Sequence, residues 1–307
     1  MFATMYMGMR TIGILTLVSL FLISCDSEGD KKKSHKPELD RSDNVADSGE
    51  MYESAKTIFY SMPSPLELST LIKTAGGEFR LDLLVSPTNN NQYQSTFKKS
   101  MILGIYAADM SYATIYDQQN DAIKYLAACK RVGESIGVHE AFSASLIERA
   151  NANIGDRDSM LNIMTEMYWA TSSQLQEENR DQIALLAMSA GWIEGLYIGS
   201  SLLDPDNPDP EISKRMAEQK FASAQLKEIF DSYPAGDPLV DEAKPMLEPL
   251  FELFGSLNAT IDTPNSTSQS KTGVTTIGGK RTIEFKREHV VRLKELAESL
   301  RTKIVNP

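Results

Sequence analysis

Apolar residues recur every three to four positions along most of the chain between residues 94 and 257, and strand-like alternation is rare. This spacing is typical of helices that bury one face. We therefore predict seven helices, over residues 94–117, 120–137, 139–152, 157–177, 181–203, 209–232 and 238–257. The breaks between them carry Gly, Pro, Asn or Asp, which favour turns. Because the connections are short, successive helices should pack antiparallel.

Two further helices are predicted before this region. The first covers residues 51–62 and ends at Pro63. The second begins at Ser64-Pro65-Leu66-Glu67, which offers a capping serine, a proline at the first helical position and a glutamate for a capping box. It should end at Gly76-Gly77, as a glycine C-cap would.

The pattern changes between residues 258 and 286. Residues 258–272 are rich in Ser, Thr, Asn and Pro and should form a mobile loop. The stretch TGVTTIGGKRTIEF places β-branched residues on both sides of Gly278-Gly279, which predicts a small β-hairpin.

A last helix is predicted over residues 287–305. It should dock through an apolar seam onto its own body. The seam consists of Val290, Leu293, Ala297, Leu300 and Ile304.

These elements indicate an all-α fold, either an antiparallel multi-helix bundle or stacked helix pairs, with the small β-hairpin near the C-terminus. A weak internal repeat favours the stacked pairs, because residues 101–136 and 188–232 both place a glycine- and aromatic-rich helix before a polar amphipathic one. The expected division is a helical body over residues 50–257, a loop and hairpin over 258–286, and a docking helix over 287–307.

The N-terminus carries a different signal. Arg10 precedes an apolar run over residues 11–24, which is too short to span a hydrocarbon core about 30 Å thick comfortably. A charged start followed by such a run is typical of a signal peptide. The run ends in Leu22-Ile23-Ser24-Cys25.

This ending resembles the lipobox of bacterial lipoprotein precursors. The resemblance implies that residues 1–24 are a signal peptide, that the Cys25 thiol receives a diacylglyceryl group, and that Cys25 begins the mature chain with an acylated amino group. The membrane is then a partner through the lipid on Cys25. The alternative is an ordinary secretory signal followed by a chance cysteine. The body is similar to all-α lipoproteins of Gram-negative envelopes, a resemblance that brings no activity with it.

Residues 25–49 are charged, rich in serine and poor in large apolar groups, so they should form a flexible tether. The acids Asp26, Glu28 and Asp30 resemble two different sorting signals, one for export to the cell surface and one for retention in the inner membrane. We expect a lipid-anchored envelope protein, in the outer membrane on its periplasmic side or at the cell surface.

Composition narrows the function classes. The chain has 42 acidic against 31 basic residues, a net charge of −11, and loss of the signal peptide with Arg10 makes it −12. This balance argues against sequence-independent nucleic-acid binding, which needs basic residues for the phosphates. Cys129 is the second of two cysteines and shares a helical face with Ala122 and Leu126, so we expect a core residue.

The stretch over residues 183–203 has one charge, Glu194, and small residues at Gly191, Gly195 and Gly199. It could cross a membrane by length. The central acid and the moderate hydropathy favour a buried central helix, whose glycines let another helix approach closely.

Asp109 and Glu194 are the acids with the most apolar sequence surroundings, and a buried carboxylate must be paired, hydrogen-bonded or protonated. One interpretation is a ligand pocket in which aromatic side chains join these two acids. The other is that a tyrosine hydroxyl, a helix N-terminus or a basic residue satisfies each carboxylate, and we favour it. The aromatic candidates for the pocket are Tyr106, Tyr112, Trp192 and Tyr197.

Named catalytic and metal motifs fail in this sequence. His139-Glu140 resembles the start of a zinc-protease helix, but position 143 holds serine where that motif needs a second histidine. No metal site or cofactor is therefore predicted. The expected function is a binding or scaffold module, with an envelope protein as a candidate partner. The alternatives are a ligand-binding or hydrolytic protein using Asp109 and Glu194, and an assembly factor with an exposed apolar patch.

Overall fold

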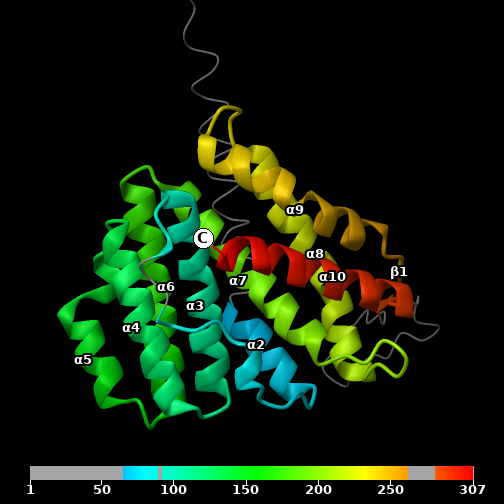
Figure 1. Cartoon of the computed structure of the whole chain (residues 1–307), viewed down its shortest axis with the longest axis horizontal. Coiled ribbons are helices and arrows are strands. Elements are labelled where there is room, and N and C mark those ends of the chain that lie inside the picture. Colours follow the sequence, from blue (N-terminus) through cyan, green and yellow to red (C-terminus); the bar gives the residue numbers. More distant parts are fainter. Residues whose placement is uncertain (1–64, 89–91, 262–280, 307) are drawn as a thin grey trace, which may run out of the picture. The chain divides into compact units, whose positions relative to one another are not determined.

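The structure is a computed structural model that describes residues 65–88, 92–261 and 281–306. In that part of the chain the fold is all-α, as predicted, with one small antiparallel sheet (Figure 1). The helices are α2 (Pro65–Thr74), α3 (Thr96–Ile115), α4 (Gln119–Ser135), α5 (Ala144–Ala152), α6 (Arg157–Glu177), α7 (Asp181–Ser201), α8 (Pro210–Ser232), α9 (Pro238–Ser256) and α10 (Arg287–Val305). The predicted helix over residues 51–62 lies outside the described residues.

Two details differ from the sequence prediction. The helix expected over residues 139–152 is divided into a single 3-10 turn, η3 (Glu140–Phe142), and α5, because Ser143 is extended (ψ 149°). A second 3-10 turn, η1 (Leu81–Leu83), had not been expected. Both are single turns, for which a 3.6-residue period gives no signal.

Aspartates at three helix starts confirm the predicted breaks. The Asp156, Asp209 and Asp237 carboxylates each accept hydrogen bonds from two backbone N–H groups in the first turn of α6, α8 and α9, at 2.9–3.2 Å. Proline follows the aspartate in α8 and α9, where its missing N–H costs nothing. At the other end of a helix, Gly76 has φ +90° and closes α2 as a glycine C-cap.

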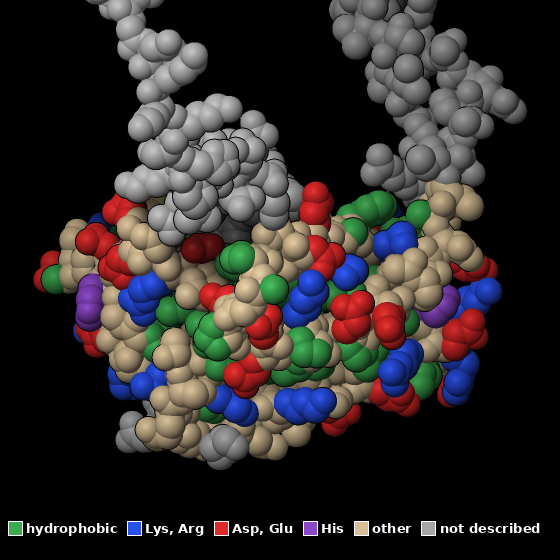
Figure 2. Space-filling view, turned by 90° about the horizontal axis from the view of Figure 1, so that it is seen from above, with side chains coloured by type: hydrophobic (Ala, Val, Ile, Leu, Met, Phe, Trp, Pro, Cys, Tyr) green, Lys and Arg blue, Asp and Glu red, His purple; other side chains and the backbone are tan. Residues whose placement is uncertain are grey.

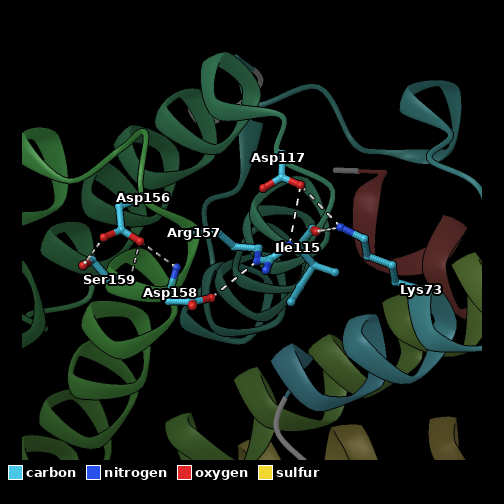
Figure 3. Close-up of polar contacts among 7 residues, drawn as sticks. All are labelled: Lys73, Ile115, Asp117, Asp156, Arg157, Asp158 and Ser159. Atoms are coloured by element: carbon cyan, nitrogen blue, oxygen red, sulfur yellow. Dashed lines mark hydrogen bonds and ion pairs between the residues drawn. The ribbon is translucent and has the colours of Figure 1, made fainter.

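The C-terminal ends of five helices receive a basic side chain from elsewhere in the chain. Lys73 donates to the Ile115 carbonyl of α3 (Figure 3), and Arg180 donates to the Ile136 carbonyl after α4. Three lysines act in the same way, namely Lys294 on Leu203 O after α7 (2.8 Å), Lys220 on Phe254 O of α9 (3.0 Å) and Lys98 on Lys303 O of α10 (2.5 Å). A cation at this end satisfies the last carbonyls and complements the helix dipole. Each bond also joins segments that are distant in sequence.

Helix α7 is the centre of the body. It contacts α2, α3, α6, α8, α9 and α10, and Figure 1 shows it between α3 to α6 on one side and α8 to α10 on the other. Among the described residues it is the helix that is long and apolar enough to cross a membrane, with a mean hydropathy of 1.3. However, 89% of that window is buried inside the molecule. The interpretation as a buried central helix is supported.

Glycines let neighbouring helices approach α7 closely. A Cβ atom on Gly104 of α3 would lie 1.8 Å from the Ala187 carbonyl oxygen of α7, so the two backbones are in direct contact. A Cβ on Gly195 would lie 2.2 Å from Leu68 of α2. The expected role of small residues in α7 is therefore correct at Gly195, and α3 contributes a glycine of its own.

The sheet near the C-terminus joins β1 (Ala259–Ile261) to β2 (Arg281–Ile283), with Thr260 opposite Thr282. The small β element is thus present, but the prediction that residues 258–272 form only a loop is wrong for 259–261. Three residues are too short for a period of two to stand out, and the pairing is long-range. The turn predicted at Gly278-Gly279 lies outside the described residues.

Helix α10 docks onto its own body, as predicted. Its five seam residues are all buried, each with an exposed fraction of 3% or less. It packs against α7, α9 and α3. The carbonyl groups at its C-terminal end accept hydrogen bonds from Tyr93 and Lys98, next to the start of α3.

Candidate functional site

Three helices bring three ionisable groups together in the core. Asp109 comes from α3, Glu194 from α7 and Arg301 from α10. Asp109 and Glu194 are both 0% exposed, and the Arg301 side chain is 16% exposed. The close contact of α3 with α7 at Gly104 and Ala187 lies five residues before Asp109 and seven before Glu194, so it sets the approach of the two acids.

Arg301 supplies the counter-ion and the hydrogen bonds of the Glu194 carboxylate. Its Nε donates to both oxygens of the Glu194 carboxylate, at 2.8 and 3.0 Å, and its Nη2 donates to the Leu83 carbonyl at 2.5 Å. The guanidinium also lies over the Tyr197 ring, 4.2 Å from its centroid. A buried ion pair needs such additional bonds, because desolvation of the two charges opposes it.

Only one of the two Asp109 carboxyl oxygens accepts a hydrogen bond within the described part of the chain. Its Oδ2 accepts a hydrogen bond from the Val85 backbone N–H at 3.1 Å. Its Oδ1 is buried and has no hydrogen-bond donor among the described residues. Glu194 is close enough to Asp109 for the two carboxyl groups to affect each other's pKa, but two ionised carboxylates are both acceptors and cannot bond to each other.

Burial and the mutual charge of the acids shift their proton affinity. Burial first, and the nearby charge of Glu194 second, raise the pKa of Asp109 well above its ordinary value of 3.8. Burial also raises the pKa of Glu194 above 4.5, against the opposing effect of Arg301. Desolvation disfavours the charged form of any acid, and one cation cannot compensate two anions.

The segment over residues 83–86, which begins at the last residue of η1, runs beside the cluster and is held by side chains from three helices. Arg301 bonds Leu83 O, Asp109 bonds Val85 N, and Tyr125 of α4 donates to Val85 O at 2.8 Å. Tyr106 of α3 donates to Ser86 O at 3.2 Å. The polar groups of the cluster therefore also satisfy backbone groups that would otherwise be buried without partners.

Tyr112 lies away from the two acids. Its hydroxyl donates to Glu78 O at 2.8 Å and accepts from the Arg80 backbone N–H at 3.1 Å, and its ring stacks on Phe79. Burial raises its pKa to about 12. Tyr112 is thus part of the contact between α3 and the segment that follows α2.

Trp192 also has a different set of partners. Its Nε1 donates to Gln219 Oε1 of α8 at 3.1 Å, and its ring lies 5.7 Å from that of Phe254. Two helical positions correspond to about 200° of rotation, so Trp192 and Glu194 face opposite sides of α7. Of the aromatic candidates, Tyr197 and Tyr106 lie at the cluster, whereas Tyr112 and Trp192 do not.

Arg301 is the member that the sequence analysis did not name. A signal for it exists in the sequence. Arg301 stands four residues after Ala297 and three before Ile304, so it occupies the apolar seam of α10. A cation in such a seam implies a buried acid opposite to it.

The other reactive side chains have structural surroundings. Cys129 is 2% exposed, and burial raises the pKa of its thiol, so it is a core residue as predicted. The Nδ1 atom of His289 accepts a hydrogen bond from Lys286 N at the start of α10. Within residues 65–88, 92–261 and 281–306, no group of three His, Cys, Asp or Glu side chains could hold a metal ion.

Comparison with models of protein families, with curated proteins and with solved structures finds no match to this chain. In the arrangement seen here Glu194 is occupied by Arg301 and both acids are fully buried. A ligand pocket at Asp109 and Glu194 stays a prediction, and it would require Arg301 and α10 to move aside.

Proposed function

We propose that the protein is a lipid-anchored protein of the bacterial cell envelope, held at a membrane through the lipid on Cys25. Its helical body then acts as a binding or scaffold module. The observation that carries the proposal is the sequence Leu22-Ile23-Ser24-Cys25 after an apolar run of signal-peptide length. Two or more acyl chains on one residue anchor a protein stably, whereas one holds it only marginally.

The position of the apolar helix α7 supports this mode of attachment. Most of its surface is covered by other helices of the body, and it contains Glu194 paired with Arg301. Insertion of α7 into a bilayer would expose this ion pair and the core around it, which is unfavourable. A lipid on Cys25 attaches the chain while the core stays closed.

The surroundings of the second cysteine support Cys25 as the modified one. Cys129 lies in the core between α4 and its neighbours and is 2% exposed. A buried thiol with a raised pKa is a poor nucleophile. Cys25 is therefore the residue expected to carry lipid.

The surface bears on the class of partner that the body could bind. On the face shown in Figure 2, acidic and basic side chains are interspersed among apolar ones. Such a mixed surface is compatible with contact to another protein, whereas binding to a nucleic acid needs a positive patch. We expect an envelope protein as partner and the outer membrane, on its periplasmic side or at the cell surface, as location.

Metabolic labelling with an alkyne analogue of palmitate tests the anchor in a Gram-negative host. The wild-type protein and Cys129→Ala, the matched control, should take up the label and fractionate with membranes. Cys25→Ser should lose the label and leave the membrane fraction. An unmodified Cys25 in the mature protein, or a chain that still begins at Met1, would contradict the proposal.

A further inference from the structure

The strongest unexplained feature of the body is the charge balance among Asp109, Glu194 and Arg301. The two carboxyl groups are 0% exposed, and the side chain of the one guanidinium is 16% exposed. If both acids were ionised, the cluster would hold one negative charge with no counter-ion. Isolated buried charges are among the most unfavourable groups in a protein interior.

The hydrogen bonds show which acid can hold a proton. Both Glu194 oxygens already accept from Arg301, and Asp109 Oδ2 already accepts from Val85 N. Asp109 Oδ1 is the one carboxyl oxygen of the cluster without a donor. A proton on Oδ1 turns this oxygen from an acceptor without a donor into a donor, for which the neighbouring Glu194 carboxylate is the candidate acceptor.

We propose that Asp109 and Glu194 share one proton, carried on Asp109, and that this proton is a latch that keeps α10 docked on α3 and α7. With the proton present, the cluster is one ion pair and one neutral acid. When the proton is lost, the two carboxylates repel each other and compete for Arg301. The guanidinium already donates to Glu194 and to the Leu83 carbonyl, so the second carboxylate lacks a counter-ion, the contact of α10 with α3 and α7 weakens, and water enters.

The groups around Asp109 leave Arg301 as the cation of the cluster. Tyr125 and Cys129 of α4 and Tyr106 of α3 are close enough to Asp109 for its charge to affect them, and burial raises the pKa of each, so all three are neutral. The basic side chains that α2 and α6 direct toward α3 meet Asp117 instead, two turns beyond Asp109 (Figure 3).

The change of stability with pH that the latch implies has a defined direction. An acid whose folded-state pKa is raised binds a proton in the folded protein at pH values where the unfolded chain has lost it. The stability contributed by Asp109 is therefore fully present below its ordinary pKa of 3.8 and is lost as the pH rises toward the raised value. One proton changes the folding equilibrium constant by up to about tenfold per pH unit in this window.

Spectroscopy of the intact chain in detergent tests the proton directly. Full-length protein with ¹³C-labelled aspartate carboxyl groups should show, at neutral pH, one aspartate signal in the protonated position that titrates only at higher pH. The signal should vanish in Asp109→Asn and persist in Asp117→Asn, an exposed acid near the same helix. If every aspartate of the wild type is ionised at neutral pH, the proposal is overturned, whether or not the Asn variant folds.

Hydrogen exchange tests the latch itself. At alkaline pH, the amides of α10 should exchange faster in the wild type than in Asp109→Asn measured at the same pH. The ratio of the two rates should grow by up to about tenfold for each unit by which the pH is raised within the window. Asparagine keeps the acceptor for Val85 N and a donor toward Glu194 without a charge. Equal exchange in wild type, Asp109→Asn and Asp117→Asn across the titration of Asp109 would show that the proton does not hold α10.

Discussion

Two ion clusters in this protein use the same kinds of side chains in opposite surroundings. Asp109, Glu194 and Arg301 join α3, α7 and α10 with exposed fractions of 0%, 0% and 16%. Just beyond the end of α3, Asp117 meets Lys73 of α2 at 3.4 Å and Arg157 of α6 at 3.7 Å, and all three side chains are 37–57% exposed (Figure 3).

The comparison shows what burial adds to an ion pair. Water and salt compensate the charges of the exposed cluster, so removing one member changes little. In the buried cluster, charges and protons must balance among the three side chains themselves. The effect of a substitution there should depend on which other members remain.

The largest effect is expected when Arg301 loses both anions. In Glu194→Gln alone, Asp109 can release its proton and become the counter-ion, which limits the loss of stability. In the double variant Asp109→Asn/Glu194→Gln, the guanidinium stays buried without an anion, which typically costs about 3–5 kcal/mol. Denaturant unfolding of the two single variants and the double variant at neutral pH measures this.

The control is whether the losses of stability in the two single variants add up to the loss in the double variant. Asp109→Asn alone should be neutral or stabilising above the ordinary pKa of aspartate, because it removes the need to bind a proton. Residues in one network are coupled, so the double variant should lose more than the sum of the singles. Additive losses would contradict the shared role of the two acids.

The second largest effect concerns the helix contact that positions the buried acids. In Gly104→Ala the new Cβ atom would lie 1.8 Å from Ala187 O, so α3 and α7 must separate. Overpacking of this kind costs about 1–3 kcal/mol. Gly255→Ala is the matched control, since no atom lies within 4 Å of its added Cβ, and it should be neutral or slightly stabilising. The thermal unfolding midpoint should fall in Gly104→Ala and stay the same or rise slightly in Gly255→Ala. Equal midpoints in the two variants would contradict the role of the Gly104 contact.

A smaller effect is expected at the end of α10. Lys98 donates to Lys303 O at 2.5 Å and to Asn306 O at 2.6 Å, so Lys98→Met should cost about 1 kcal/mol and speed amide exchange in the last turn of α10. Lys99→Met, at the next position of α3, is the control and should leave that turn unchanged. Equal exchange in both variants would rule out a capping role for Lys98.

The sequence predicted the helices well because their ends carry local chemistry. The bounds of α6 agree with the predicted 157–177, since Asp156 caps its start with side-chain bonds to the first turn. Asp-Pro pairs similarly mark the starts of α8 and α9. The strand at residues 259–261 was missed because its partner lies 22 residues away and no local signal specifies that pairing.

The buried cluster could be predicted only in part. Asp109 and Glu194 stand out because each is a charge in an apolar helix. Arg301 does not stand out in the same way, since α10 carries many charged residues and only its register with Ala297 and Ile304 reveals it. The separation of Tyr112 and Trp192 from the acids depends on tertiary packing, and no spacing in the sequence encodes it.

The smallest effect is expected at the exposed cluster, in Asp117→Asn. Asp117 has φ +59°, a conformation that asparagine tolerates better than most residues. The lost ion pairs with Lys73 and Arg157 are long and exposed, so the free energy of unfolding should change by less than about 0.5 kcal/mol. This small difference should disappear at high salt, because salt screens exposed charges. The deficit of Asp109→Asn/Glu194→Gln should persist at high salt, because its unpaired charge is buried. If Asp117→Asn instead destabilised the protein as much as the buried double variant, burial would not be what separates the two clusters.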